Sequence, residues 1–347
     1  MTSSGKCLTW FAIMGIALLN SVAWADEFTA EFELRLSSYH PATKVQLGEI
    51  NAAGNFFFRN GEWLIRFQTN QFKGFQTWET GSDGRLVYQV RRNSLYVDEG
   101  KMGAISRGPV PDWDLGNDQM NVLWMAYASH DYLKKSTNDY LPKICPLRNG
   151  ELMNTEDYLM KANWLLADTA PAFTRQITFI DDLSPIDSAD NEEQSSNLKR
   201  IGSGVTNAVY QCLTTTNVGG MILPLRFSFE IFHHRTNDER MVTILFEGIT
   251  LSASSKCEPA SLLPEIPKAL TVNFKKGSGP RNVSDKRFGK SLKGFYYHMR
   301  EKWLTDDEEV KRLPEYQLTL VQQPKRYRKD VKDAAPENSR PAGNRGQ

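Results

Sequence analysis

Two tight turns within one aromatic-rich stretch, residues 54–90, most constrain how this chain can fold. Asn60-Gly61 separates two apolar runs, and both residues tolerate the positive φ angles that a two-residue hairpin turn requires. Residues 81–84, Gly-Ser-Asp-Gly, place a second turn signal one hairpin later. The stretch therefore predicts a four-stranded antiparallel meander with aromatic residues on both faces, around which the rest of the chain is organised.

Alternation of apolar and polar residues predicts further strands on both sides of this meander. The clearest begins the mature chain at residues 28–36, and Pro41 ends it. The other predicted strands cover residues 46–58, 164–167, 173–180, 205–213, 225–231, 242–246 and 270–274. Residues 93–115 hold several glycines and prolines and are expected to be irregular. The pattern is typical of a mainly β (α+β) protein.

Two stretches carry a helical period instead. Met120, Leu123, Trp124 and Tyr127 follow the i, i+3, i+4, i+7 pattern and predict a helix over residues 119–133 that packs across the sheet. An ordinary core helix and a mobile lid over a cavity both fit this pattern. A second apolar stripe predicts a helix over residues 290–303, and residues 306–313 are expected to add an acidic helical turn.

The N-terminal residues 1–25 have the composition of a cleaved signal peptide. Lys6 precedes an apolar run over residues 7–22, and Ala23-Trp24-Ala25 fits the small-x-small cleavage rule. We therefore expect a protein exported to the periplasm or the extracellular space and not membrane-spanning. Residues 26–321 are expected to form one large β-rich domain, or two halves (26–180 and 205–321) joined by the polar loop 181–204. Residues 322–347 are expected to be a disordered charged tail.

Charge and cysteine content exclude several function classes. Removing residues 1–25 takes away one base and no acid, so 41 basic residues face 41 acidic ones, and this balance argues against a nucleic-acid partner. The remaining cysteines, Cys145, Cys212 and Cys257, are far apart, which excludes a C-x-x-C metal or redox motif. They allow at most one internal disulfide, and buried unpaired thiols fit equally well.

The common catalytic signatures are missing from the sequence. It contains no Gly-x-Ser-x-Gly elbow, no His-Glu-x-x-His, no phosphate loop and no dinucleotide fingerprint. Ser129-His130-Asp131 has the residue types of a triad, but neighbours on a helix point in different directions. Glu230 and Glu247 fall on predicted neighbouring strands, where solvent-facing acids are the simpler interpretation than a glycosidase pair. We expect no catalytic residue, no metal site, no cofactor and no enzyme activity.

Residues 54–90 also resemble the periplasmic lipoprotein-carrier superfamily of the LolA, LolB and LppX type. The similarity is carried by Arg-Asn-Gly-x-Trp-x-Ile-Arg followed by Ser-Asp-Gly-Arg-Leu-Val-Tyr. The chain is similar, too, to uncharacterised secreted planctomycete and verrucomicrobial-type proteins through Pro-Leu-Arg-Phe-Ser-Phe at 224–229 and Val-Ser-Asp-Lys-Arg-Phe at 283–288. This resemblance implies a curved antiparallel sheet that forms an unclosed half barrel, with helices on its concave face and acyl chains held in its cavity.

Three functional hypotheses follow. The first is a non-catalytic binding or carrier protein that holds a lipid or lipoprotein acyl chain in a half-barrel cavity. The residues expected to line this cavity are Phe28, Phe32, Leu34, Trp63, Ile65, Phe67, Met120, Leu123, Trp124 and Tyr127. The second is an extracytoplasmic structural or interaction protein with a filled core, and the third is a secreted hydrolase. Ligand identity and oligomeric state are not encoded in any motif.

Overall fold

A computed structural model describes the chain over residues 27–40, 42–71, 74–93, 101–108, 110–111, 118–137, 140–142, 159–167, 173–181, 205–218, 220–234, 240–266, 282–288, 295–298 and 302–322. The predicted signal peptide, most of the polar loop 181–204, the strand expected at 270–274, Cys145 and the tail beyond residue 322 lie outside these described residues.

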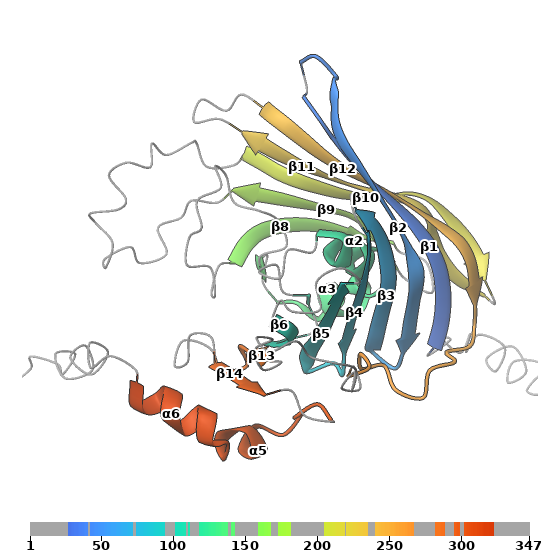
Figure 1. The fold of residues 1–347 in the computed structure, drawn as a ribbon. Helices are drawn as coiled ribbons and strands as arrows, with labels where there is room; N and C mark the ends of the chain where they lie inside the picture. Colours follow the sequence, from blue (N-terminus) through green and yellow to red (C-terminus); the bar gives the residue numbers. More distant parts are fainter. Residues whose placement is uncertain are drawn as a thin grey trace, which may run out of the picture.

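Within the described ranges, fourteen strands form one strongly curved sheet that does not close into a barrel (Figure 1). From edge to edge the order is β14-β13-β6-β5-β4-β3-β2-β1-β12-β11-β10-β9-β8-β7. The expected mainly β half barrel is thus confirmed, although one pairing, β13 with β6, is parallel. The strands are β1 Glu27–Tyr39, β2 Gln46–Arg59, β3 Glu62–Gln71, β4 Gly74–Ser82, β5 Leu86–Asn93, β6 Lys101–Arg107, β7 Tyr140–Pro142, β8 Leu159–Leu166, β9 Thr174–Asp181, β10 Val205–Val218, β11 Met221–His234, β12 Arg240–Ser254, β13 Asn282–Asp285 and β14 Phe295–His298.

The first strand lies in the middle of this sheet. On one side β2 to β6 follow it in chain order, and on the other β12 to β7 follow in reverse order. The seam between the two wings is the antiparallel β1–β12 pair, which runs from Thr29 opposite Ser254 to Tyr39 opposite Thr243. Neighbours within each wing are consecutive in the chain and antiparallel, so each wing is a meander.

Local turn chemistry sets the meander, as expected from the sequence. Asn60 and Gly61 have φ angles of 53° and 85°, which matches the predicted two-residue turn between β2 and β3. At the β4–β5 connection the carboxylate of Asp83 accepts hydrogen bonds from the backbone N–H groups of Arg85 (2.9 Å) and Leu86 (2.7 Å). The same carboxylate accepts a hydrogen bond from the Tyr88 hydroxyl at 2.9 Å, so Asp83 stabilises both the turn and the start of β5.

The helices lie on both sides of the sheet. Helices α2 (Asp118–Tyr127) and α3 (Ser129–Lys135) sit inside the curve, whereas α5 (Asp307–Lys311) and α6 (Pro314–Gln322) lie beside β14 (Figure 1). We call the face that packs against α2 the inner face and the opposite one the outer face. The acidic turn expected at 306–313 corresponds to α5, which Asp306 caps by accepting the Glu308 N–H.

Three predictions about local structure were wrong. The single helix expected over 119–133 is broken at Ala128, because Ser129 donates to Met125 O and its hydroxyl lies 2.7 Å from Thr174 of β9. The stretch 290–303, expected to be a helix, contains strand β14, where buried Phe295 and Tyr297 alternate with exposed Tyr296 and the strand pairs with β13. The irregular stretch 93–115 contains strand β6.

Alternation along the strands divides the buried apolar side chains into separate cores. The inner core gathers around α2 and takes side chains from strands of both wings. On β5, Val87 joins this inner core while Leu86, Tyr88 and Val90 point the other way. Those three pack on the outer face with the C-terminal elements, in a second core that includes Phe295, Tyr297, Trp303, Leu304 and Val310.

A buried ion pair anchors this second core. Arg287 and Asp285 are both fully buried, with Arg287 Nη2 3.0 Å from Asp285 Oδ2. Arg287 also donates to the backbone carbonyls of Leu304 and Thr305 and contacts Asp307 of α5 at 3.3 Å. One side chain therefore ties α5 to β13 at the end of the sheet.

Candidate ligand site on the inner face

The ten residues expected to line a ligand cavity come together on the inner face. All of them belong to one hydrophobic cluster, and each is at most 7 % exposed. Phe28, Phe32, Leu34, Trp63, Ile65 and Phe67 project from β1 and β3, and Met120, Leu123, Trp124 and Tyr127 project from α2. In the structure they pack against one another, so α2 occupies the hollow of the half barrel.

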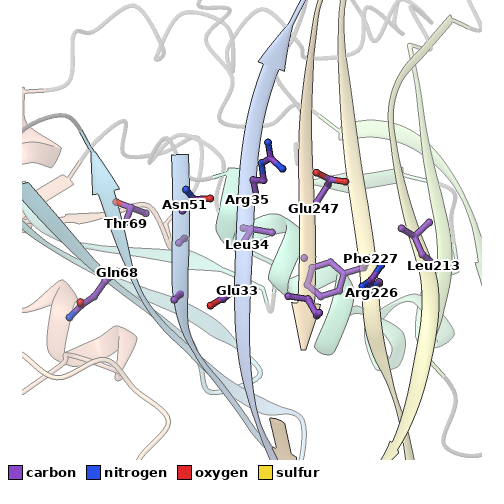
Figure 2. Close-up of a pocket in the computed structure, with 14 residues that line it drawn as sticks. Glu33, Leu34, Arg35, Asn51, Gln68, Thr69, Leu213, Arg226, Phe227 and Glu247 are labelled. Atoms are coloured by element: carbon purple, nitrogen blue, oxygen red, sulfur yellow. The ribbon is translucent and has the colours of Figure 1, made fainter. Parts of the chain in front are cut away.

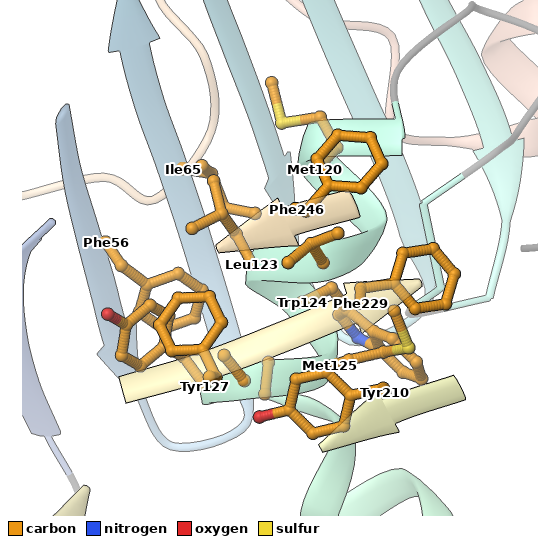
Figure 3. Packing of buried hydrophobic residues seen from close by; sticks show 14 of the residues in the cluster. Phe56, Ile65, Met120, Leu123, Trp124, Met125, Tyr127, Tyr210, Phe229 and Phe246 are labelled. Atoms are coloured by element: carbon orange, nitrogen blue, oxygen red, sulfur yellow. The ribbon is translucent and has the colours of Figure 1, made fainter. Parts of the chain in front are cut away.

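Helix α2 is held in the curve by aromatic contacts with both wings. The centroid of the Tyr127 ring lies 4.9 Å from that of the Phe56 ring of β2 and 5.7 Å from that of the Phe227 ring of β11. Figure 3 shows Tyr127 beside Phe56. Such pairs contribute about 0.5–1.5 kcal/mol beyond the area they bury. Trp124 extends the contact by packing edge-on against Tyr132 of α3, with centroids 5.9 Å apart.

A short hydrogen-bonded chain crosses this apolar surface. The Thr250 hydroxyl donates to the carbonyl of Pro224, so the Tyr127 hydroxyl, 2.8 Å from Thr250 Oγ1, is the donor in that contact. Burial raises the pKa of the Tyr127 hydroxyl well above its ordinary value, and burial does the same for Tyr210. Both phenols therefore stay neutral hydrogen-bonding groups at any physiological pH.

Other buried polar atoms on the inner face have no hydrogen-bond partner within the described part of the chain. They are Trp63 Nε1, Thr69 Oγ1, Thr80 Oγ1, Trp124 Nε1 and Tyr210 OH. The five side chains are each at most 1 % exposed. An unpaired buried donor or acceptor lowers the stability of the folded protein by about 1–3 kcal/mol, so five of them in one core are unusual. They are groups with which a bound molecule could form hydrogen bonds.

The inner face differs chemically between the central strands and strands β3 to β5. Strands β1, β2, β11 and β12 present mostly aliphatic and aromatic side chains, such as Phe32, Phe56, Phe229 and Phe246. Strands β3 to β5 add hydroxyl and amide groups, since Thr69, Thr80, Ser82 and Gln89 are all buried there. A ligand on this face would meet an apolar surface on one side and hydrogen-bonding groups on the other.

A pocket on the outer face was not foreseen from the sequence. It has a volume of about 690 Å³ and is lined from five adjacent strands, β3, β2, β1, β12 and β11, with Leu213 of β10 beside them (Figure 2). Its exposed lining residues are Glu33, Arg35, Asn51, Ala53, Gln68, Leu213, Arg226 and Glu247. The buried lining residues, such as Leu34 and Phe227, turn their side chains to the inner face and offer backbone atoms. We call this hollow the outer pocket.

Residues considered for catalysis take no joint position in the structure. Ser129 bonds to Met125 and Thr174, whereas His130 Nδ1 lies 3.1 Å from Asp131 Oδ1, so these three do not form a relay. Glu230 and Glu247 lie on paired strands, opposite Leu245 and Ser228. Across the described ranges, no group of three or more His, Cys, Asp or Glu residues is placed to hold a metal ion.

The structure tests the predictions about the cysteines and about membrane-spanning segments only in part. Cys212 and Cys257 are free thiols. No helix within the described residues has both the length and the apolar character needed to cross a membrane.

Comparison with known proteins gives distant structural neighbours. No family model matches the chain, and no curated protein matches its sequence. A DUF1329 family protein from Desulfovibrio piger aligns over 73 % of this chain and 93 % of its own length, with 5 % identity and a TM-score of 0.33. The ywiB protein from Bacillus subtilis aligns over 65 % of this chain and 94 % of its own, with 5 % identity and a TM-score of 0.20. The resemblance to lipoprotein carriers is not supported by these matches and stays a prediction.

Proposed function

We propose that this chain is an exported, non-catalytic binding protein whose half barrel holds an amphiphilic ligand, a molecule with an apolar chain and hydrogen-bonding groups. The observation that carries the proposal is the set of four buried polar atoms without partners on the strands of an otherwise apolar inner face: Trp63 Nε1, Thr69 Oγ1, Thr80 Oγ1 and Tyr210 OH. A lipid or acyl chain would make apolar contacts like those that α2 now makes with the inner face, and its polar groups would pair with these donors and acceptors.

Binding in this place requires α2 to leave the hollow. The helix contributes no strand to the sheet, so its displacement would leave every β-ladder intact. Its displacement would break the bond from Tyr127 to Thr250 and, at the start of α3, would disturb the contact of Ser129 with Thr174. The apolar face of α2 and the ligand chain would compete for the same surface of β1, β2 and β11.

A fluorescent fatty acid, 11-dansylaminoundecanoic acid, tests the proposal on the purified mature chain. Thr80→Val removes one unpaired hydroxyl while keeping the side-chain shape, so we expect unchanged or slightly higher stability and several-fold weaker probe binding. Thr77→Val on the outer face of the same strand is the matched control and should leave probe binding unchanged. Organic extraction of the protein followed by mass spectrometry should identify the natural amphiphile.

A filled core is the second candidate, and one observation favours it. The ten inner-face residues are close-packed, as the filled core of a structural or interaction protein would be. The binding proposal, by contrast, needs a ligand to displace α2 from this packing. If the probe does not bind and extraction yields no lipid, the binding proposal fails and this second candidate takes its place.

A further inference from the structure

The outer pocket is built from two neighbouring rows of side chains that cross the sheet. In one row Gln68, Ala53, Glu33, Ile249 and Arg226 stand opposite one another on β3, β2, β1, β12 and β11. In the next row Asn51, Arg35 and Glu247 stand opposite one another on β2, β1 and β12. The pocket therefore joins both wings across the β1–β12 seam (Figure 2).

Its charges are not neutralised within the pocket. Arg35 is directly opposite Glu247 in the β1–β12 register, yet its Nη2 lies 3.1 Å from Glu49 Oε2 on the other side. Within the described part of the chain, Glu247, Glu33 and Arg226 form no ion pair. Two carboxylates and one guanidinium thus remain available to a ligand.

This arrangement matches a molecule that carries both an ammonium and a carboxylate group. The two carboxylates lie on adjacent strands, where one ammonium can approach both. Arg226 lies two strands from Glu33 and one strand from Glu247, which are backbone separations of roughly 10 Å and 5 Å across the sheet, and its guanidinium suits a carboxylate. An extended peptide advances about 3.3–3.6 Å per residue, so roughly two to three residues span these distances.

The rest of the lining favours a peptide over other small ligands. Asn51 and Gln68 offer amide donors and acceptors, and Ile249 and Leu213 offer apolar contact for small side chains. Phe227, the one aromatic residue in the lining, is 1 % exposed, so no ring is available for sugar stacking. Two carboxylates also repel phosphate and other polyanions.

We propose that the outer pocket binds a short zwitterionic peptide, with its N-terminal ammonium between Glu33 and Glu247 and its C-terminal carboxylate at Arg226. This site is separate from the inner face and independent of the amphiphile proposal. The pocket volume of about 690 Å³ falls within the range of small-ligand sites.

Isothermal titration calorimetry with the full mature chain tests the site. Trialanine is the probe, and N-acetyl-trialanine, trialanine amide and maltotriose are its comparisons. We expect trialanine to bind and each blocked peptide to bind roughly tenfold more weakly or worse, because one charge-assisted contact is lost. The variants Glu33→Gln, Glu247→Gln and Arg226→Gln should weaken trialanine by a similar factor.

The controls distinguish a loss of peptide binding at the outer pocket from a loss of folding and from a change in ligand binding at the inner face. Glu230→Gln removes a charge from β11 outside the pocket and should leave trialanine binding unchanged. The pocket variants should keep the wild-type unfolding midpoint, because their side chains are exposed, and should bind the dansyl fatty acid as the wild type does. Failure of trialanine to bind, equal binding by all variants, or preference for maltotriose would each overturn the proposal.

Discussion

The ring of Phe227 on β11 fills the space over Gly248 on β12, so that a Cβ atom at residue 248 would lie 2.1 Å from Phe227 Cε2. No side chain fits at that distance without moving the ring, which is itself almost fully buried. This contact lies beside the seam between the two wings and beneath the outer pocket. The Phe227 ring therefore requires glycine at position 248.

We expect Gly248→Ala to destabilise the protein by about 2 kcal/mol or more, because overpacking forces Phe227 out of its place. Urea unfolding followed by tryptophan fluorescence would measure the change. Gly48→Ala on β2 is the control, since its Cβ would meet only Ser38 Oγ at 3.6 Å, an ordinary contact. Equal midpoints for the two variants would contradict the role assigned to the Phe227 contact.

The buried Asp285–Arg287 pair predicts a large effect from a small change. Asp285→Asn leaves a fully buried guanidinium with only the partly exposed Asp307 carboxylate at 3.3 Å, and removing the buried partner of such a pair costs about 3–5 kcal/mol. The double variant Asp285→Leu/Arg287→Met removes both charges and should be less destabilised than the single variant. Glu308→Gln, which breaks only the exposed Lys311 pair, should cost less than about 1 kcal/mol. A single-variant cost as small as that of Glu308→Gln would refute this account.

Asp307 should make the docking of α5 sensitive to acid. Partial burial alone would raise the pKa of Asp307, but hydrogen bonds from Arg85 and Arg287 outweigh it and hold the pKa below its usual value. A lowered folded-state pKa gives stability that is present above the unfolded pKa, about 3.9, and is lost as pH falls through the folded value.

The expected size of this acid effect is at most about 1 kcal/mol, because the Asp307 side chain is 34 % exposed and solvent screens the pairs. Urea unfolding of the wild type and Asp307→Asn at pH 7, 4 and below measures it. The stability difference should be largest at pH 7 and shrink below about pH 4. A difference that stays constant across this range would exclude the linkage.

The Cys212 thiol should react slowly with alkylating reagents. Burial raises the pKa of the Cys212 thiol to about 11, so little thiolate forms near neutral pH. Alkylation by iodoacetamide at pH 8 should be roughly two orders of magnitude slower than for a free cysteine, and should accelerate as pH rises toward that value. Peptide mapping by mass spectrometry assigns the labelled residue, and the urea-unfolded chain gives the unprotected rate. Equal rates in folded and unfolded protein would contradict the burial of this thiol.

Features with local causes were readable from the sequence. The Asn60-Gly61 turn follows from the φ angles that two residues tolerate, and the strand at 28–36 follows from strict alternation. The inner-face residues were found for the same reason, because a period of two on strands and of 3.6 on α2 marks their buried sides. What periodicity could not tell is whether these side chains surround a hollow or fill it.

Features with distant causes were missed. Phe295, Tyr296 and Met299 fit a helical stripe, but pairing with β13 makes residues 295–298 a strand. Ala128 interrupts the expected helix because Ser129 meets Thr174, 45 residues further along the chain. The outer pocket needs the register of five strands at once, and no short stretch of sequence records that register.

The central position of β1 has a kinetic consequence. Each wing is made of chain neighbours and can begin to form as its residues become available, but the seam between β1 and β12 joins residues as far apart as Thr29 and Ser254. Closing so long a loop is slow relative to local pairing. We therefore expect β1 and β12 to pair later than the hairpins within each wing, and the two sites proposed here are complete only once that seam has closed.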